Sequence, residues 1–93
     1  MRLKEPEKEI IRKEIIKHDP DAHVFLFGSR ADDRLRGGDI DILVISSRID
    51  YQKKLLIRRE LFKKLDDQKI DIVISADTAH PFVRSIYAEA VPL

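Results

Sequence analysis

The chain has 93 residues, which suits one small domain with a modest core, and we expect residues 1–93 to form a single domain. Cysteine is absent, so disulfides and thiolate zinc sites are excluded. Charged residues make up 38% of the chain, yet the formal net charge is +1, a balance that does not favour an electrostatic nucleic-acid binder. No apolar run approaches the roughly 20 residues of a membrane span, and the start is charged rather than signal-like. The composition therefore predicts a soluble cytoplasmic protein.

Periodicity, prolines and glycines divide the chain into short elements. Asp19-Pro20 is expected to end the first helix, because proline disfavours helical backbone at the residue before it. Ser29 is the expected cap of a short helical turn, and Gly37-Gly38 marks the loop that follows. In chain order we expect a helix over 5–18, a strand over 23–28, a helical turn over 30–34, a strand over 39–46, a helix over 51–66, a strand over 69–75 and a helix over 78–88.

The helix over 51–66 has the clearest pattern of the three. We expect one apolar stripe to face the core and the opposite side to be a solvated basic face. The stripe consists of Tyr51, Leu55, Phe62 and Leu65, widened by Ile57 and Leu61. The basic side carries Lys53, Lys54, Arg59, Lys63 and Lys64.

The connections between the strands predict the topology. About ten residues join the first two strands, which favours an antiparallel pair, and a helix joins the second to the third, which favours a parallel right-handed crossover. The expected fold class is α/β (α+β): a small mixed sheet with an antiparallel first strand pair and a helix crossover to a parallel strand, flanked by helices. In such a sheet the first strand ends where the next two begin. Gly28-Ser29, Asp39–Asp41 and Asp71 should therefore meet at one edge.

Three aspartates at this edge are candidate metal ligands. Asp39 and Asp41 are two apart on a strand, so both side chains point to one face, while Ile40 and Ile42 point into a core. Parallel pairing would place Asp71 beside the first two. Three carboxylates there can hold two hard divalent cations around an in-line phosphoryl displacement.

Gly28-Ser29-Arg30 is the candidate phosphate-binding turn. Gly28 lets the backbone approach a ligand closely because it has no Cβ. Ser29 opens a helical turn whose free amides suit a phosphate, and Arg30 can neutralise phosphate charge. Asp32 and Asp33 follow, and we assign them to turn formation rather than metal binding. A Gly-Ser turn or an Asp-x-Asp pair is weak in isolation, but the combination indicates a nucleotide site.

These motifs resemble a known family. Gly28-Ser29, nine residues, then Asp39-Ile40-Asp41-Ile42 is similar to the signature of the DNA polymerase beta-like nucleotidyltransferase superfamily. The Gly-Ser-Arg-Ala sequence at 28–31 resembles its minimal nucleotidyltransferase branch. The resemblance runs from the leading helix through Asp71 and implies a polymerase beta palm-like fold. Gly38 departs from the pattern, since many members have serine there, but that serine is not a metal ligand.

The resemblance assigns roles to the candidate residues. It implies that Asp39, Asp41 and Asp71 bind two Mg²⁺ ions and that Asp71 also helps to activate the attacking hydroxyl. It implies that Gly28 and Ser29 hold the triphosphate of ATP. These roles describe a magnesium-dependent nucleotidyltransferase.

The resemblance also implies a partner. Minimal nucleotidyltransferases are often encoded beside a HEPN-domain protein, a helical ribonuclease toxin, and some act as antitoxins by transferring AMP from ATP to a tyrosine on that toxin. Larger relatives carry a second domain for the acceptor, and we expect a partner protein to supply the acceptor here, within a homo- or hetero-oligomer. The alternative is a non-catalytic, nucleotide-binding antitoxin or subunit that acts by direct contact with its partner.

Overall fold

The computed structural model describes residues 2–32, 34 and 38–93. In chain order its elements are α1 (Glu5–His18), β1 (His23–Phe27), the 3-10 turn η1 (Gly28–Ala31), β2 (Ile40–Ile45), α2 (Tyr51–Lys64), β3 (Ile70–Ser75), α3 (Pro81–Glu89) and β4 (Val91–Pro92). The expected helices and strands are present, with ends displaced by a few residues. Gly37 and Asp33, which fall in the expected turns, lie outside the described residues. Of the described residues, none belongs to a helix that is both long and apolar enough to cross a membrane.

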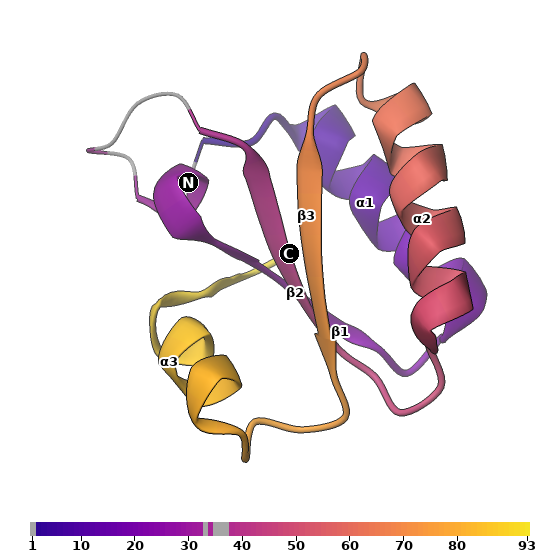
Figure 1. The fold of residues 1–93 in the computed structure, drawn as a ribbon. Helices are drawn as coiled ribbons and strands as arrows, with labels where there is room; N and C mark the ends of the chain where they lie inside the picture. Colours follow the sequence, from indigo (N-terminus) through magenta and orange to yellow (C-terminus); the bar gives the residue numbers. More distant parts are fainter. Residues whose placement is uncertain (1, 33, 35–37) are drawn as a thin grey trace.

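The sheet has the expected mixed topology, with strand order β3-β2-β1-β4 (Figure 1). β1 and β2 are antiparallel, and β2 and β3 are parallel, joined by α2. β4 was not expected. It pairs antiparallel with β1, and the Leu93 N–H donates to the Val24 carbonyl at 2.9 Å. Two residues are too few to show strand periodicity, so only the pairing with β1 reveals this strand.

One face of the sheet carries the main core. α1 and α2 lie together on that face, and α3 lies on the other (Figure 1). Alternate residues of β2 point toward α1 and α2, and Ile40, Ile42 and Val44 are fully buried there. On the other face α3 buries Val83, and its Tyr87 ring meets Phe25 edge-on at 5.2 Å. The expectation that Ile40 and Ile42 point into a core is confirmed.

α2 buries only part of its expected apolar stripe. Ile57, Leu61 and Leu65 face the core and are buried, as expected. The expected stripe was wrong for three residues that are exposed instead: Tyr51 at 69%, and Leu55 and Phe62 at 43% each. Both rows are apolar at helical spacing, so periodicity alone could not decide between them. Packing against α1 and the sheet selects the row without aromatic side chains.

The basic side of α2 is solvated in part. Arg59 and Lys63 are exposed, as expected. Lys64 is also exposed, and its Nζ lies 3.6 Å from Oε2 of the buried Glu14 of α1. Lys53 donates to the Arg48 carbonyl at 3.4 Å. These contacts use part of the basic side to join α2 to its neighbours.

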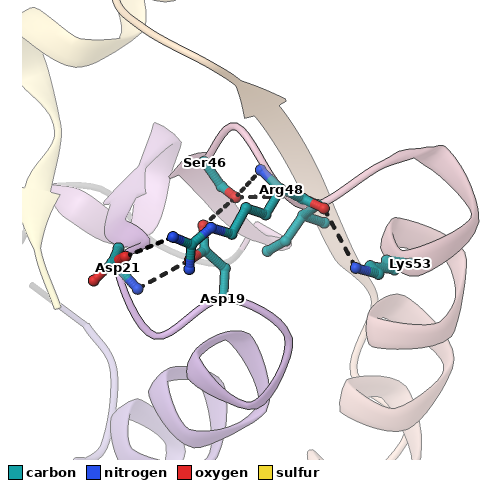
Figure 2. A network of polar contacts seen from close by, with 6 residues as sticks. Asp19, Asp21, Ser46, Arg48 and Lys53 are labelled. Carbon is teal, nitrogen blue, oxygen red and sulfur yellow. Dashed lines mark hydrogen bonds and ion pairs between the residues drawn. The ribbon is translucent and has the colours of Figure 1, made fainter.

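A polar network closes the end of the sheet away from the aspartate cluster (Figure 2). Ser46 is buried, and its Oγ donates to Asp19 Oδ2 at 2.5 Å. The same oxygen accepts the N–H groups of Arg48 and Ile49 at 3.1 and 3.2 Å. Asp19 also accepts the Asp21 N–H at 3.0 Å. The network joins the α1–β1 connection to the β2–α2 connection, and the Ser46 hydrogen bond lowers the pKa of Asp19.

Ser46→Ala is expected to destabilise the fold by about 1.5–3 kcal/mol, because it removes a hydrogen bond to a buried carboxylate and leaves two N–H groups without their acceptor. Urea unfolding measures the change, with the exposed neighbour Ser47→Ala as the control. The lowered pKa of Asp19 means that its stabilising effect is present above the ordinary value of 3.8 and is lost as the pH falls below it. The difference between Ser46→Ala and the parent should therefore shrink in acid. Equal loss in the two serine variants would contradict this assignment.

Candidate active site

The expected meeting of strand ends is present in the structure. β1 ends at Phe27, which pairs with Asp41 near the start of β2, and Asp41 pairs with Asp71 near the start of β3. Gly28 follows Phe27 directly and opens η1. The candidate phosphate-binding turn therefore lies beside Asp41 and Asp71, where three neighbouring strands meet.

Asp41 and Asp71 form the centre of the cluster. They are cross-strand neighbours in the β2–β3 ladder, and both are half-buried. Burial, Asp71 and Asp39 together raise the pKa of Asp41, and Lys69 opposes that rise. The raised pKa shows that negative charge at this position is only partly compensated.

Asp39 is placed differently from the other two acids. It precedes β2, its side chain is 46% exposed, and its Oδ2 lies 3.5 Å from Lys69 Nζ. Among the described residues, no three acidic or histidine side chains are gathered closely enough to hold one metal ion together. Asp39 shares the edge with Asp41 and Asp71, and its carboxylate is paired with Lys69.

The donor set nevertheless fits a hard divalent cation. Carboxylate oxygens are the ligands that Mg²⁺ prefers, and the two central carboxylates are already adjacent. A cation there would offset the burial of Asp41 and its repulsion by Asp71 and Asp39, which together raise the pKa of Asp41. Asp39 would complete the set by a rotation of its exposed side chain away from Lys69.

Two glycines shape the backbone around the cluster. Gly28 has φ +74°, and a Cβ at this position would overlap the Asp41 carboxylate. Gly38 has φ +85°, and a Cβ there would overlap the Ser29 hydroxyl. Both positions need the left-handed backbone that glycine favours and the space that a side chain would fill. Gly38 therefore suits this chain, in which Ser29 occupies the place that a larger residue would need.

Ser29 does not cap a helix, contrary to expectation. η1 begins at Gly28 after Phe27, without a side-chain cap, so Ser29 lies inside the 3-10 turn. Its carbonyl accepts the Asp32 N–H and a guanidinium N–H of Arg2, each at 3.2 Å. Gly28 provides the tight turn after the strand, and the helical turn therefore starts two residues earlier than the sequence pattern indicates.

Arg30 is held from two sides. Its Nε donates to the Gly38 carbonyl at 3.3 Å, and its Nη2 donates to Gln68 Oε1 at 3.1 Å. Gln68 in turn donates to Glu7 of α1 at 2.7 Å. Two of the five N–H donors of the guanidinium are thus used. They join η1 to the residues just before β2 and just before β3. Arg30 positions the loop, and its remaining donors are the ones that could meet a phosphate.

The loop after η1 borders a polar hollow. Asp32 pairs with Arg34 through two contacts of 2.8 and 3.0 Å, which lower the pKa of Asp32 to about 2. This pairing agrees with a role in the turn, and Asp33 lies outside the described residues. A cavity of about 480 Å³ is lined by Gly28, Ala31, Asp32, Arg34 and Glu89. The hollow places open space directly against the glycine of the proposed phosphate turn.

Lys69 and Gln68 were missed by the sequence analysis. Their signal lies in a repeated pattern: Lys69-Ile70-Asp71 on β3 stands opposite Asp39-Ile40-Asp41 on β2. Aligning the two segments in parallel register would have placed Lys69 beside Asp39. Gln68 leaves no comparable signal, since its partners come from three separate elements.

Comparison with known proteins supports the assignment of the fold. A comparison with curated proteins gives no significant match. A solved chain from a crystal structure of the toxin–antitoxin MntA–HpeT, a mutant with two Asp-to-Glu changes, is similar with a TM-score of 0.69 and 24% identity. The match covers 92% of this chain and 70% of that chain, and at this identity it shows the fold. Residues 8–93, which include the Gly-Ser turn and the three aspartates, match the family described as polymerase beta, nucleotidyltransferase. The resemblance noted from the motifs is thereby confirmed, and the chain belongs to the polymerase beta nucleotidyltransferase family.

Proposed function

We propose that this chain is a magnesium-dependent nucleotidyltransferase that transfers AMP from ATP to an acceptor hydroxyl. The observation that carries the proposal is the Asp41–Asp71 pair beside Gly28. Two carboxylates lie next to a glycine whose backbone a ligand can approach closely. Family membership supports it, since polymerase beta nucleotidyltransferases generally use divalent metals.

The residues divide into two groups. Asp39, Asp41 and Asp71 would hold two Mg²⁺ ions, and these ions supply Lewis-acid stabilisation for the phosphoryl oxygens when bound. Gly28 and Ser29 would hold the triphosphate, with the backbone of Gly28 facing the 480 Å³ hollow. Arg30 would add donors to the phosphates from its fixed position beside Gly38.

The proposed step is an in-line displacement at the α-phosphorus of ATP. The acceptor oxygen forms a bond to that phosphorus while the bond to the bridging oxygen of the β-phosphate breaks. Pyrophosphate leaves, and the acceptor hydroxyl loses its proton to Asp71. The cross-strand position of Asp71 supports this role, because it lies next to Asp41 but on a separate strand.

We propose a tyrosine on a HEPN-type partner protein as the acceptor, so that the chain acts as an antitoxin. The similar solved chain belongs to the toxin–antitoxin MntA–HpeT, and this likeness supports the choice of partner. A phenolic hydroxyl offers the oxygen nucleophile that the step requires.

Incubation with labelled ATP, Mg²⁺ and the product of the neighbouring reading frame tests the proposal. The expected result is label on the partner and a mass increase of one or more AMP groups, abolished by EDTA. Replacement of the modified tyrosine by phenylalanine is the control for the acceptor. Neutralisation of the partner without label transfer would support the alternative, in which the chain acts by contact alone.

Gly28→Ala is expected to weaken ATP binding by more than tenfold, since the new Cβ would collide with the Asp41 carboxylate and strain a backbone with φ +74°. Ser29→Ala should cost only about 1 kcal/mol through one lost hydrogen bond. Calorimetric titration with ATP and Mg²⁺ compares the two variants. ATP affinity at the parental level in Gly28→Ala would rule out this placement of the phosphate turn.

A further inference from the structure

The acidic cluster contains a lysine at a fixed place in the ladder. Asp39 and Lys69 directly precede Ile40 and Ile70, which pair in parallel register. The Lys69 carbonyl accepts the Ile40 N–H at 3.2 Å, so the two strand approaches are already in contact. Asp39, Asp41, Lys69 and Asp71 therefore form a two-by-two arrangement at the start of β2 and β3, with three acids and one base.

The lysine side chain is directed at the outer acid. Lys69 Nζ lies 3.5 Å from Asp39 Oδ2, and the positive charge of Lys69 also opposes the raised pKa of the neighbouring Asp41. The side chains of Lys69 and Asp39 are 63% and 46% exposed, so either can turn into solvent without disturbing the core. An ion pair of this kind is weak and reversible.

We propose that Lys69 is the resident counter-cation of this cluster: its ammonium neutralises Asp39, competes with a divalent cation for that carboxylate, and so makes metal binding depend on the nucleotide. The inference rests on the proposed function of the aspartates and concerns a residue to which that function assigns no role. A metal that approaches Asp39 must displace the ammonium. The phosphates of a bound nucleotide then offer that ammonium another anionic partner.

Manganese binding measures the competition directly. Titration of Mn²⁺, followed by electron paramagnetic resonance at low salt, is compared in the parent, Lys69→Met and Lys63→Met. Lys63 is a matched control, because its side chain is 62% exposed, it also pairs with an acid, and it lies on α2 away from the cluster. Lys69→Met should tighten Mn²⁺ binding about two- to fivefold, the size expected for the loss of an exposed ion pair. Lys63→Met and Lys69→Arg should leave the Kd at the parental value.

A non-hydrolysable ATP analogue tests the link to the nucleotide. In the parent, the analogue should tighten Mn²⁺ binding more than it does in Lys69→Met, because in the variant no ammonium has to be moved. In an Asp39→Asn background, Lys69→Met should no longer tighten Mn²⁺ binding.

The outcomes separate this inference from the proposed function. If the parent binds Mn²⁺ and Lys69→Met has the same Kd as Lys63→Met, the inference is wrong and the metal site stands. Equal tightening in Lys69→Met within the Asp39→Asn background would also overturn it, since the effect would not pass through Asp39. If the parent does not bind Mn²⁺ with or without the analogue, the proposed function fails and the inference fails with it.

Discussion

Asp41→Asn is expected to abolish AMP transfer and, in the metal-free chain, to raise the melting temperature. Asp41 is the central carboxylate of the cluster. It pairs with Asp71 across the β2–β3 ladder, its carboxylate lies against Gly28, and Asp39 precedes it by two residues in the chain. Loss of a shared metal ligand removes several kcal/mol of charge stabilisation in the transition state, a rate loss of at least about a thousandfold. The fold is retained, because asparagine has nearly the same shape and removes a like charge.

The stability gain has a defined pH dependence. The pKa of Asp41 is raised in the folded chain, so the folded state binds the proton more tightly than the unfolded state. The destabilising effect of the ionised group is therefore absent below the ordinary value of 3.8 and develops as the pH rises through the raised pKa. Calorimetric melting should show no gain for Asp41→Asn in acid and the full gain at neutral pH.

Asp67→Asn is the matched control for this charge change. Asp67 is exposed in the α2–β3 connection with φ 60°, a backbone region that asparagine tolerates. The Asp67→Asn variant should keep the parental transfer rate. Full transfer by Asp41→Asn with Mg²⁺ would refute the two-metal site, whatever the change in melting temperature.

Asp71→Asn is expected to reduce the transfer rate by about 10²–10⁴-fold while ATP·Mg²⁺ affinity stays within a few-fold of the parent. A general base contributes rate enhancement of that size and little ground-state binding. The half-buried asparagine can keep the cross-strand position beside Asp41, so the strand pairing is retained. Single-turnover transfer to the partner, together with ATP titration, separates rate from affinity.

The glutamate variant distinguishes a catalytic carboxylate from a residue that only pairs the strands. Asp71→Glu should recover part of the rate, because it restores a carboxylate at the same place. A parental rate in Asp71→Asn would show that Asp71 only takes part in strand pairing and that the site uses two acids.

The sheet and its functional edge were predictable because they depend on local signals. Ile40 and Ile42 alternate with Asp39 and Asp41, so one face had to be apolar and the other acidic. The short connection before β2 and the helical connection after it fixed the antiparallel and parallel pairs. From these two facts the meeting of Gly28, Asp41 and Asp71 followed.

The features that escaped prediction all depend on tertiary contacts. The apolar stripe of α2 was predicted only in part, because two apolar rows compete at helical spacing and only tertiary packing leaves Tyr51, Leu55 and Phe62 exposed. The Ser46–Asp19 bond joins residues 27 apart in sequence, beyond the reach of any local pattern. Lys69 was overlooked because a lone lysine before a strand carries no meaning until its cross-strand neighbour is known.

The cluster lies at the very start of the β2–β3 ladder, so fraying of these strand ends moves the residues of the site. The first rung there is the 3.2 Å bond from the Ile40 N–H to the Lys69 carbonyl, and the core rungs follow at Ile42 and Ile72. End rungs open with less free energy than central ones, so amide exchange at Ile40 should be faster than at the buried Val44. Each opening separates Asp41 on β2 from Asp71 on β3 while the apolar layer below stays closed. The alignment of the carboxylates is therefore governed by a local equilibrium of one or two hydrogen bonds, and a substitution can loosen the site without a measurable change in global unfolding.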